Sequence, residues 1–235
     1  MEKLWFVRGG QIEYSFAHSL QLSLRDKVER ENIPGFLLLM EHPPVFTLGK
    51  GASRNHLLVD ESVLEKEGIK LYEVERGGDI TYHGPGQIVG YPIINLNFWR
   101  KDVHLFLRSL EEAIIRFLRR FEVEAFRLPP YTGVWVRRET PQKIAAIGIA
   151  VKRWVTYHGF ALNISTFLPH FSYIVPCGII DKGVTSLEHV TGHFYSLEER
   201  EKMQEFLAQD LGEVLGFRVK EISKVDLILE RGLSL

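Results

Sequence analysis

The chain contains a single cysteine, Cys177, which stands between a proline and a glycine in Pro176-Cys177-Gly178. These neighbours predict a sharp bend that presents the sulfur and frees nearby backbone N–H groups. A free thiol is only a few per cent ionised at neutral pH, so nucleophilic chemistry here requires a nearby cation or base. The alternative interpretation is an inert, buried cysteine that packs as a small hydrophobic residue.

Lys143 is a candidate for the activating group, because it begins an otherwise apolar run that continues to Ala150. Partial desolvation of a lysine at the edge of such a strand suits it to act as a base, whereas a solvated lysine at a turn is the common alternative. Small residues at Ala145, Ala146 and Gly148 leave room for an alkyl chain, or for close packing of a helix. Further candidate activators are His83, His158, His170, Lys182 and His189.

A glycine-rich stretch at residues 76–87 reads Arg76-Gly77-Gly78-Asp79-Ile80-Thr81-Tyr82-His83-Gly84-Pro85-Gly86-Gln87. Glycine lets backbone approach a ligand closely and permits positive φ. Strand-like runs at 71–74 and 88–94 flank the stretch, which therefore predicts a ligand-facing loop on a sheet. A long hairpin turn is the alternative.

The run His158-Gly159-Phe160-Ala161-Leu162-Asn163 places a glycine inside a predicted strand, which is typical of a close ligand or backbone approach. A structural histidine is the alternative for His158. Neither the P-loop nor the dinucleotide-binding spacing occurs, and no Cys/His cluster has the spacing of a zinc site. We therefore expect no metal and no cofactor.

Composition narrows the class of protein. The chain has 235 residues, 45% of them hydrophobic and 25% charged, which is ordinary for one soluble globular domain. A net charge of -1 argues against a general role in binding nucleic acid or membrane surfaces. No apolar run is long enough to span a bilayer, and the N-terminus lacks a signal-peptide pattern. With one cysteine and no targeting signal, we expect a cytoplasmic protein.

Hydrophobic periodicity supplies the elements that must position these residues. It predicts helices over 14–31, 102–121 and 196–215, the last with a capping box at Ser196 and Glu199 and an end at Gly216. Asp60 is expected to cap a further short helix, and Asp102 the second long one. Strands are predicted over 4–7, 36–40, 45–48, 71–74, 88–94, 133–138, 143–151, 157–164 and 217–222. This pattern favours a single α+β domain over 1–235 with a mostly antiparallel or mixed sheet.

Six blocks of the chain, in family order, resemble the lipoyl(octanoyl) transferases. They are residues 41–49 (EHPPVFTLG), 76–87, 132–136 (TGVWV), 143–148 (KIAAIG), 158–163 (HGFALN) and 176–178 (PCG). Several blocks in order are far more specific than any one motif. The resemblance implies the biotin/lipoate protein ligase fold, an α+β (α/β) domain with mixed, mostly antiparallel sheets flanked by helices.

The resemblance also implies an activity and a site. The family transfers octanoyl from acyl carrier protein to a lysine of lipoyl domains, in 2-oxoacid dehydrogenase complexes and the glycine cleavage H protein. Cys177 then corresponds to the residue that holds the acyl chain as a thioester, and Lys143 to the lysine that acts beside it. The implied substrate-binding residues are Arg76, Gly77, Gly78, Asp79, Ile80, Thr81, Tyr82, His83, Ala146, Ile147, Gly148, Gly159, Phe160 and Ala161.

Other readings remain open at this point. They are an ATP-dependent lipoate ligase on the same fold, a papain-like cysteine hydrolase using Cys177 with His158 or His189, and a non-enzymatic acyl-binding module. Because acyl carrier proteins are acidic, a basic docking face is also expected. Its candidates are Arg116, Arg119, Arg120, Arg127, Arg137 and Arg138, although a solvated helix face explains the first three equally well.

Overall fold

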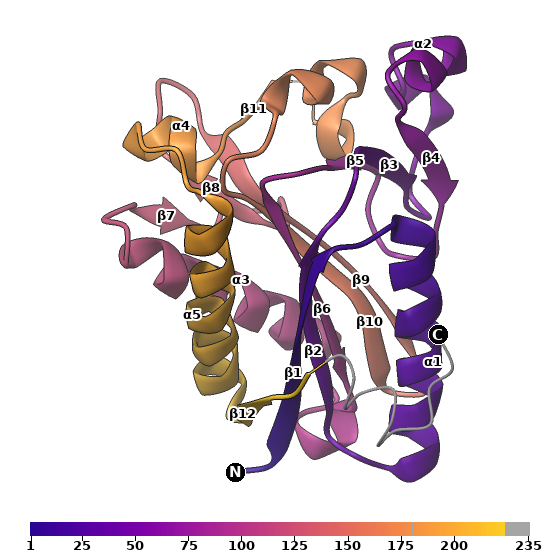
Figure 1. Ribbon diagram of the computed structural model, residues 1–235, viewed down its shortest axis with the longest axis vertical. Coiled ribbons are helices and arrows are strands. Elements are labelled where there is room, and N and C mark those ends of the chain that lie inside the picture. The colour runs from indigo at the N-terminus through magenta and orange to yellow at the C-terminus, as the bar shows by residue number, and fades with distance from the viewer. Residues whose placement is uncertain (180, 224–235) are drawn as a thin grey trace.

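The computed structural model describes residues 1–179 and 181–223, which form a large and a small β-sheet with helices on both sides (Figure 1). The large sheet contains β1 (Lys3–Gln11), β2 (Gly35–Glu41), β6 (Gln87–Ile94), β7 (Ala125–Phe126), β8 (Val134–Val136), β9 (Gln142–Lys152), β10 (Val155–Asn163), β11 (Gly183–Val184) and β12 (Arg218–Glu221). The small sheet contains β3 (Val45–Leu48), β4 (Lys70–Glu73) and β5 (Ile80–His83). The α-helices are α1 (Tyr14–Glu31), α2 (Glu61–Lys66), α3 (Val103–Arg119), α4 (Leu187–Thr191) and α5 (Leu197–Leu215).

Strand order makes the large sheet mixed and mostly antiparallel. Over the described ranges the order is β12-β1-β2-β6-β10-β9-β8-β7, with β11 paired to β9. The pairs β12–β1, β1–β2 and β11–β9 are parallel, and the other pairs are antiparallel. The predicted fold class is therefore confirmed. The small sheet, in the order β4-β3-β5, stands at one end of the large one (Figure 1).

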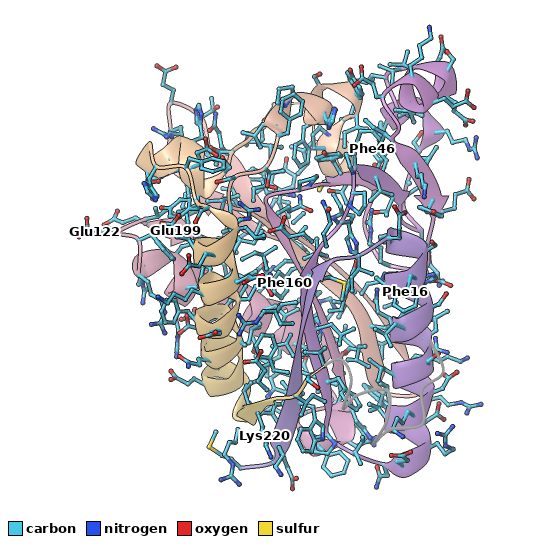
Figure 2. The ribbon with its side chains drawn as sticks, viewed as in Figure 1. Phe16, Phe46, Glu122, Phe160, Glu199 and Lys220 are labelled. Atoms are coloured by element: carbon cyan, nitrogen blue, oxygen red, sulfur yellow. The ribbon has the colours of Figure 1, made fainter. Side chains whose placement is uncertain are left out.

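Helices cover both faces of the large sheet, which explains why the central strands β2, β6 and β10 are buried along their whole length. Helix α1 packs Ala17, Leu24 and Val28 against one face, while α3 and α5 cover the other (Figure 1). Every residue of β2 is buried, because its side chains alternate between these two cores. Figure 2 shows Phe160 in the interior between the helix layers, and Glu122, Glu199 and Lys220 at the periphery.

Local signals place most helix ends where the sequence predicts them. Asp102 accepts a hydrogen bond from the Leu105 N–H at the start of α3. The capping box of α5 forms as predicted, and Gly216 ends that helix in a left-handed conformation. The prediction for Asp60 is wrong in its detail: α2 follows this residue, but the aspartate side chain makes no capping hydrogen bond.

The glycine-rich stretch is not a continuous loop. Its middle forms β5, which pairs with β3 from Val45 opposite His83 to Leu48 opposite Ile80. Strand alternation therefore divides the stretch, so that Thr81 and His83 face one side of β5, whereas Ile80 and Tyr82 face the other. The density of glycines conceals this short strand in the sequence.

Three 3₁₀ turns outside the sheets are also relevant to the site: η1 (Arg54–His56), η3 (Leu168–Tyr173) and η4 (Pro176–Gly178), while η2 (Leu96–Phe98) precedes α3. No helix within residues 1–179 and 181–223 combines the length and apolarity needed to cross a membrane. The prediction of a single domain over residues 1–235 stays a prediction, and it includes residues 180 and 224–235, which lie outside the described residues.

The contact between β6 and β10 gives a first test of the fold. A Cβ atom at Gly159 would lie 2.0 Å from the carbonyl oxygen of Gly90 and 2.6 Å from Cδ of Pro92, so Gly159→Ala must push two central strands apart. We expect a loss of unfolding free energy of about 1–3 kcal/mol, measured by urea denaturation. At Gly77 the added Cβ meets its first atom at 3.5 Å, so Gly77→Ala is the matched control. Equal stability of both variants would contradict the steric argument.

Candidate active site

A cavity of about 270 Å³ lies where the small sheet meets β6, β9 and β10 of the large sheet. Its wall is formed by residues from both sheets, from α1 and from the turn η4. They are Tyr14, Arg76, Gly77, Gly78, Asp79, Thr81, His83, Val89, Tyr91, Pro130, Tyr131, Thr132, Lys143, Ala146, Ile147, Gly148, His158, Gly159, Phe160, Ala161, Cys177 and Ile179. Cys177 and Lys143, which are far apart in the sequence, also line a smaller adjoining hollow together.

Cys177 lies on a tight turn whose flanking residues are hydrogen-bonded to the segment between β3 and α2. Its backbone is left-handed, with φ 57°, and the following Gly178 is also left-handed, with φ 69°. The Val175 N–H donates to the His56 carbonyl at 2.8 Å, and the Leu58 N–H donates to the Tyr173 carbonyl at 2.8 Å. These bonds hold the turn at the cavity wall and leave the thiol partly exposed.

The Asp79 carboxylate packs against this turn. Its Oδ2 accepts a hydrogen bond from His56 Nδ1 at 2.5 Å, and its Oδ1 accepts one from the Ile80 N–H at 2.7 Å. A Cβ atom at Gly178 would lie only 2.7 Å from Asp79 Oδ2. The glycine after the cysteine is thus required both by its positive φ and by the close approach of this carboxylate.

A β-bulge directs Lys143 into the cavity. Val134 of β8 pairs with Ala145, whereas the next residue, Trp135, pairs with Lys143, so β9 carries one extra residue here. Consequently Ile144 and Ala145 both pack into the same core. The bulge places Lys143 in the cavity wall with Ala146, whereas strict alternation would have placed the lysine on the same face as Ala145.

The Lys143 side chain is only 6% exposed and lies against an aromatic ring. Its Nζ is 4.9 Å from the centre of the Trp135 ring, a cation–π geometry. The backbone is held by β8 on one side and by β11 on the other, where the Thr185 N–H donates to the Lys143 carbonyl at 3.0 Å. The position of the amine is therefore restricted by two strands and a ring.

Arg76 forms hydrogen bonds that hold the loop at residues 76–79, here called the glycine loop, and its guanidinium does not extend freely into the cavity. Its Nη2 donates to the Thr47 carbonyl at 2.6 Å and to the Thr47 hydroxyl at 2.9 Å, and its Nη1 donates to the Gly77 carbonyl at 3.1 Å. Burial lowers the pKa of Arg76 below its ordinary value. The guanidinium thus ties β3 to the loop that follows β4.

Backbone contacts hold the same loop from two directions. The Gly77 N–H donates to the Ile149 carbonyl at 2.9 Å, and a Cβ atom at Gly148 would lie 2.6 Å from the Gly77 carbonyl oxygen. On the other side the Gly51 N–H donates to the Gly78 carbonyl at 3.1 Å. Glycines at these positions let main chain pack directly on main chain.

Neutral histidines form the polar part of the wall and its support. His83 Nδ1 donates to Gln87 Oε1 at 2.8 Å, and burial, with His42 as the next cause, lowers the pKa of His83 to about 3. His42 Nδ1 donates to the Ile12 carbonyl at 2.6 Å while Nε2 accepts from the Tyr91 hydroxyl at 2.7 Å. Burial lowers the pKa of His42 to about 4.

Most residues expected in the site line the cavity, with two exceptions. Ile80 and Tyr82 are fully buried in the core of the small sheet, because alternation along β5 turns them away from Thr81 and His83. Tyr82 instead donates its hydroxyl to His170 Nδ1 at 2.8 Å.

Among the candidate activators of Cys177, only some reach its cavity. Lys143, His83 and His158 do. His170 and His189 line a separate surface groove, and Lys182 is paired with Asp181. Sequence reasoning missed seven residues that complete the wall: Tyr14, Val89, Tyr91, Pro130, Tyr131, Thr132 and Ile179. The motif around Thr132 was the only signal that pointed to any of them.

Three of the six arginines expected in a basic docking face, Arg116, Arg120 and Arg127, form ion pairs within the chain. Arg120 binds Asp210 with two hydrogen bonds at 2.9 and 2.7 Å. Arg127 pairs with Glu111 and Glu112, and Arg116 also pairs with Glu112. These side chains join α3 to α5 and to the segment after α3, which gives them a structural role.

Comparison with known proteins agrees with the architecture. Residues 13–209 match the family model of the lipoyl protein ligase A/B catalytic domain. A bipartite lipoate protein ligase from Thermoplasma acidophilum has a similar structure, with a TM-score of 0.70 at 19% identity, covering 99% of this chain and 92% of that one. A lipoate-protein ligase A solved with bound ATP gives a TM-score of 0.67 at 19% identity over 99% of this chain and 94% of its own. The fold is thus that of the lipoate protein ligases.

Relatives of higher sequence identity show which family within this fold the chain belongs to. An octanoyltransferase of Thermoanaerobacter pseudethanolicus is 45% identical over 224 residues, which cover 95% of each chain. One from Caldicellulosiruptor bescii is 47% identical over 215 residues, covering 90% of this chain and 93% of that protein. The chain therefore belongs to the octanoyltransferase family, whose members are acyltransferases of protein lipoylation. The resemblance stated from the sequence is confirmed.

Two of the buried histidines, His42 and His83, predict an acid-sensitive fold. Their folded-state pKa values, about 3 for His83 and about 4 for His42, lie below the ordinary 6.5, so stability is complete above pH 6.5 and is lost as the pH falls towards these values. As the pH falls from 6.5 to 5, the slope that each histidine contributes should rise from about 0.7 towards about 1.4 kcal/mol of unfolding free energy per pH unit.

Denaturation at a series of pH values in chelator-treated buffer tests this. His42→Gln should lower the slope of unfolding free energy against pH by the contribution of one histidine. Tyr91→Phe removes the hydroxyl partner of His42 but retains both histidines, so its slope should match that of the unaltered protein. An unchanged slope in His42→Gln would show that this histidine does not titrate on unfolding.

Proposed function

We propose that this octanoyltransferase works through a covalent octanoyl thioester on Cys177, with Lys143 as the group that moves protons. The observation that carries the proposal is the meeting of these two side chains at one cavity, brought together by the η4 turn and the β9 bulge. The donor is octanoyl-acyl carrier protein. The acceptor is the target lysine of a lipoyl domain, in 2-oxoacid dehydrogenase complexes or the glycine cleavage H protein.

In the first half-reaction, the Cys177 thiolate attacks the thioester carbonyl of the carrier-bound octanoyl group. A new C–S bond forms to Cys177, the carrier C–S bond breaks, and the departing carrier thiolate takes up a proton. One thioester replaces another, so the step is close to isoenergetic. Division of the transfer into two such steps avoids one difficult direct step.

In the second half-reaction, the neutral amine of the acceptor lysine attacks the Cys177 thioester. The C–N bond forms, the C–S bond breaks, and Cys177 leaves as thiolate, while the proton lost from the attacking amine passes to Lys143. The product is an amide, which is more stable than the thioester. No step requires ATP.

The cavity wall supports the assignment of the acyl-binding residues. Ala146, Ile147, Phe160 and Ala161 supply apolar or small surface, and glycines at 148 and 159 keep the strand backbones close. The loop at Gly77 forms the opposing wall. A saturated chain attached to Cys177 would lie along this surface, which removes its methylene groups from water.

Two N–H groups that could face a developing oxyanion are already in use. The Gly178 N–H donates to the Val175 carbonyl at 3.0 Å, and the Gly77 N–H donates to Ile149. In our proposal Lys143 therefore has two roles. It transfers the proton, and in its protonated form it helps to stabilise the tetrahedral intermediate.

Intact-mass measurement tests the covalent step. Incubation with octanoyl-acyl carrier protein should add one octanoyl group to the unaltered enzyme, removable by hydroxylamine, and none to Cys177→Ala. The octanoyl mass should then disappear when an acceptor lipoyl domain is added. A folded enzyme that transfers octanoyl at full rate without any adduct would exclude the covalent mechanism.

Two substitutions of Lys143 separate its roles. Lys143→Ala should slow overall transfer by about 10²-fold or more, the usual contribution of a positioned base. Lys143→Arg keeps a cation beside Cys177 but cannot accept a proton, so adduct formation should survive better than discharge to the acceptor lysine. Single-turnover measurement of each half-reaction checks this. If both variants stay within about twofold of the original rates, which is well under 1 kcal/mol of barrier, Lys143 is not the proton carrier.

A further inference from the structure

Three potential metal ligands from distant parts of the chain converge beside the cavity. His18 comes from α1, Glu75 from the segment between β4 and β5, and His158 from β10. Both histidines point Nε2 at the same carboxylate oxygen, Glu75 Oε2, at 3.1 Å from His18 and 3.4 Å from His158. The two imidazole rings are stacked, with their centres 5.4 Å apart.

These separations are those of ligands around one small ion. A tetrahedral cation bound at about 2.0–2.1 Å by nitrogen and oxygen places neighbouring ligand atoms roughly 3.3–3.4 Å apart. The two distances to Glu75 Oε2 bracket this value, and all three ligand atoms lie within 4.8 Å of one another. Across residues 1–179 and 181–223 this is the one group of three histidine, cysteine or carboxylate ligands with such geometry.

The cluster is anchored on one side and open on the other. His158 is 2% exposed, and its backbone N–H donates to Gln21 Oε1 of α1 at 2.9 Å. His18 is 22% exposed and Glu75 is 44% exposed, so an ion can enter from solvent. Three protein ligands then leave a fourth position for water.

We propose that His18, Glu75 and His158 bind a divalent first-row transition-metal ion, with Zn²⁺ as the principal candidate. Two imidazoles and one carboxylate favour such ions over Mg²⁺ and Ca²⁺, which prefer oxygen ligands alone. The sequence predicts no metal because the ligands are 57 and 83 residues apart along the chain, too far for a spacing motif.

The position of the site suggests a structural role. Ile149 pairs with His158, and it lies roughly 20 Å along β9 from Lys143 at a rise of about 3.3 Å per residue. An ion here would join α1 and β10 to Glu75, the residue before Arg76, and so hold the base of the glycine loop. Because it would bind only the folded chain, it should raise stability by mass action.

Zinc binding is measured by competition with a chromophoric chelator, in a Cys177→Ser background that removes the only thiol. We expect one Zn²⁺ per chain. His18→Gln keeps a hydrogen-bond donor for Glu75 but is a poor zinc ligand, and it should weaken binding at least tenfold, roughly the smallest effect of disturbing a zinc site. Glu75→Gln, which is nearly isosteric, should do the same.

His193→Gln is the matched control. His193 makes a similar pair with Glu199 at 3.0 Å on the surface, but without a second histidine. This variant should bind zinc like its parent. The thermal unfolding midpoint should also rise with Zn²⁺ in the parent and in His193→Gln, and stay constant in His18→Gln. Absence of saturable binding in the parent, or full binding in His18→Gln, would overturn the site and show that the three groups form only a hydrogen-bonded cluster.

Discussion

Direct contact between main chains is the constraint on which the cavity depends. The loop after β4 is pressed between Gly49–Gly51 on one side and Gly148 with Ile149 on the other, and a side chain at Gly49 would lie 2.3 Å from the Gly78 carbonyl oxygen. Hydrogen bonds from Gly77 and Gly51, together with the buried Arg76 guanidinium, hold this arrangement. The glycines are therefore needed mainly to let the two sheets approach, and the cavity is the space that remains between them.

Several buried polar groups beneath the cavity are linked by hydrogen bonds, which restricts the movement of the wall. His83 donates to Gln87, Gln87 donates to Asn163 at 2.9 Å, and Asn163 donates to the Thr185 carbonyl at 3.0 Å. Thr185 in turn bonds the Lys143 carbonyl through its own N–H. A continuous chain of hydrogen bonds thus runs from the glycine-rich stretch to the backbone of the proposed proton carrier. Such hydrogen-bonded networks favour one arrangement over its alternatives.

Sequence patterns predicted the parts of this structure that local chemistry determines. Helix α1 has the predicted bounds, and the caps of α3 and α5 form, because capping depends on residues within one turn. The blocks around Lys143 and Cys177 indicated the cavity. The sequence could not reveal the bulge that re-aims Lys143, since it depends on pairing with β8, or the bond between His56 and Asp79, whose partners are 23 residues apart. Nor could the glycine-rich stretch show that Ile80 and Tyr82 face a separate core, because the glycines on both sides of β5 and the proline after it conceal its alternation.

Cys177 and Lys143, which we propose as nucleophile and proton carrier, are attached to different sheets. Cys177 lies on a turn that packs on β5 and is bonded to His56, so it moves with the small sheet, whereas Lys143 is fixed between β8 and β11 of the large one. The distance between Cys177 and Lys143 therefore depends on the contact between the small and the large sheet, which we call the seam. It does not depend on the stability of either sheet alone. Heating that loosens the seam would separate the pair while both cores stay folded, so inactivation would precede the main calorimetric transition. For the same reason, substitutions that add contacts between the two sheets would be the most direct way to raise the temperature at which this enzyme loses activity.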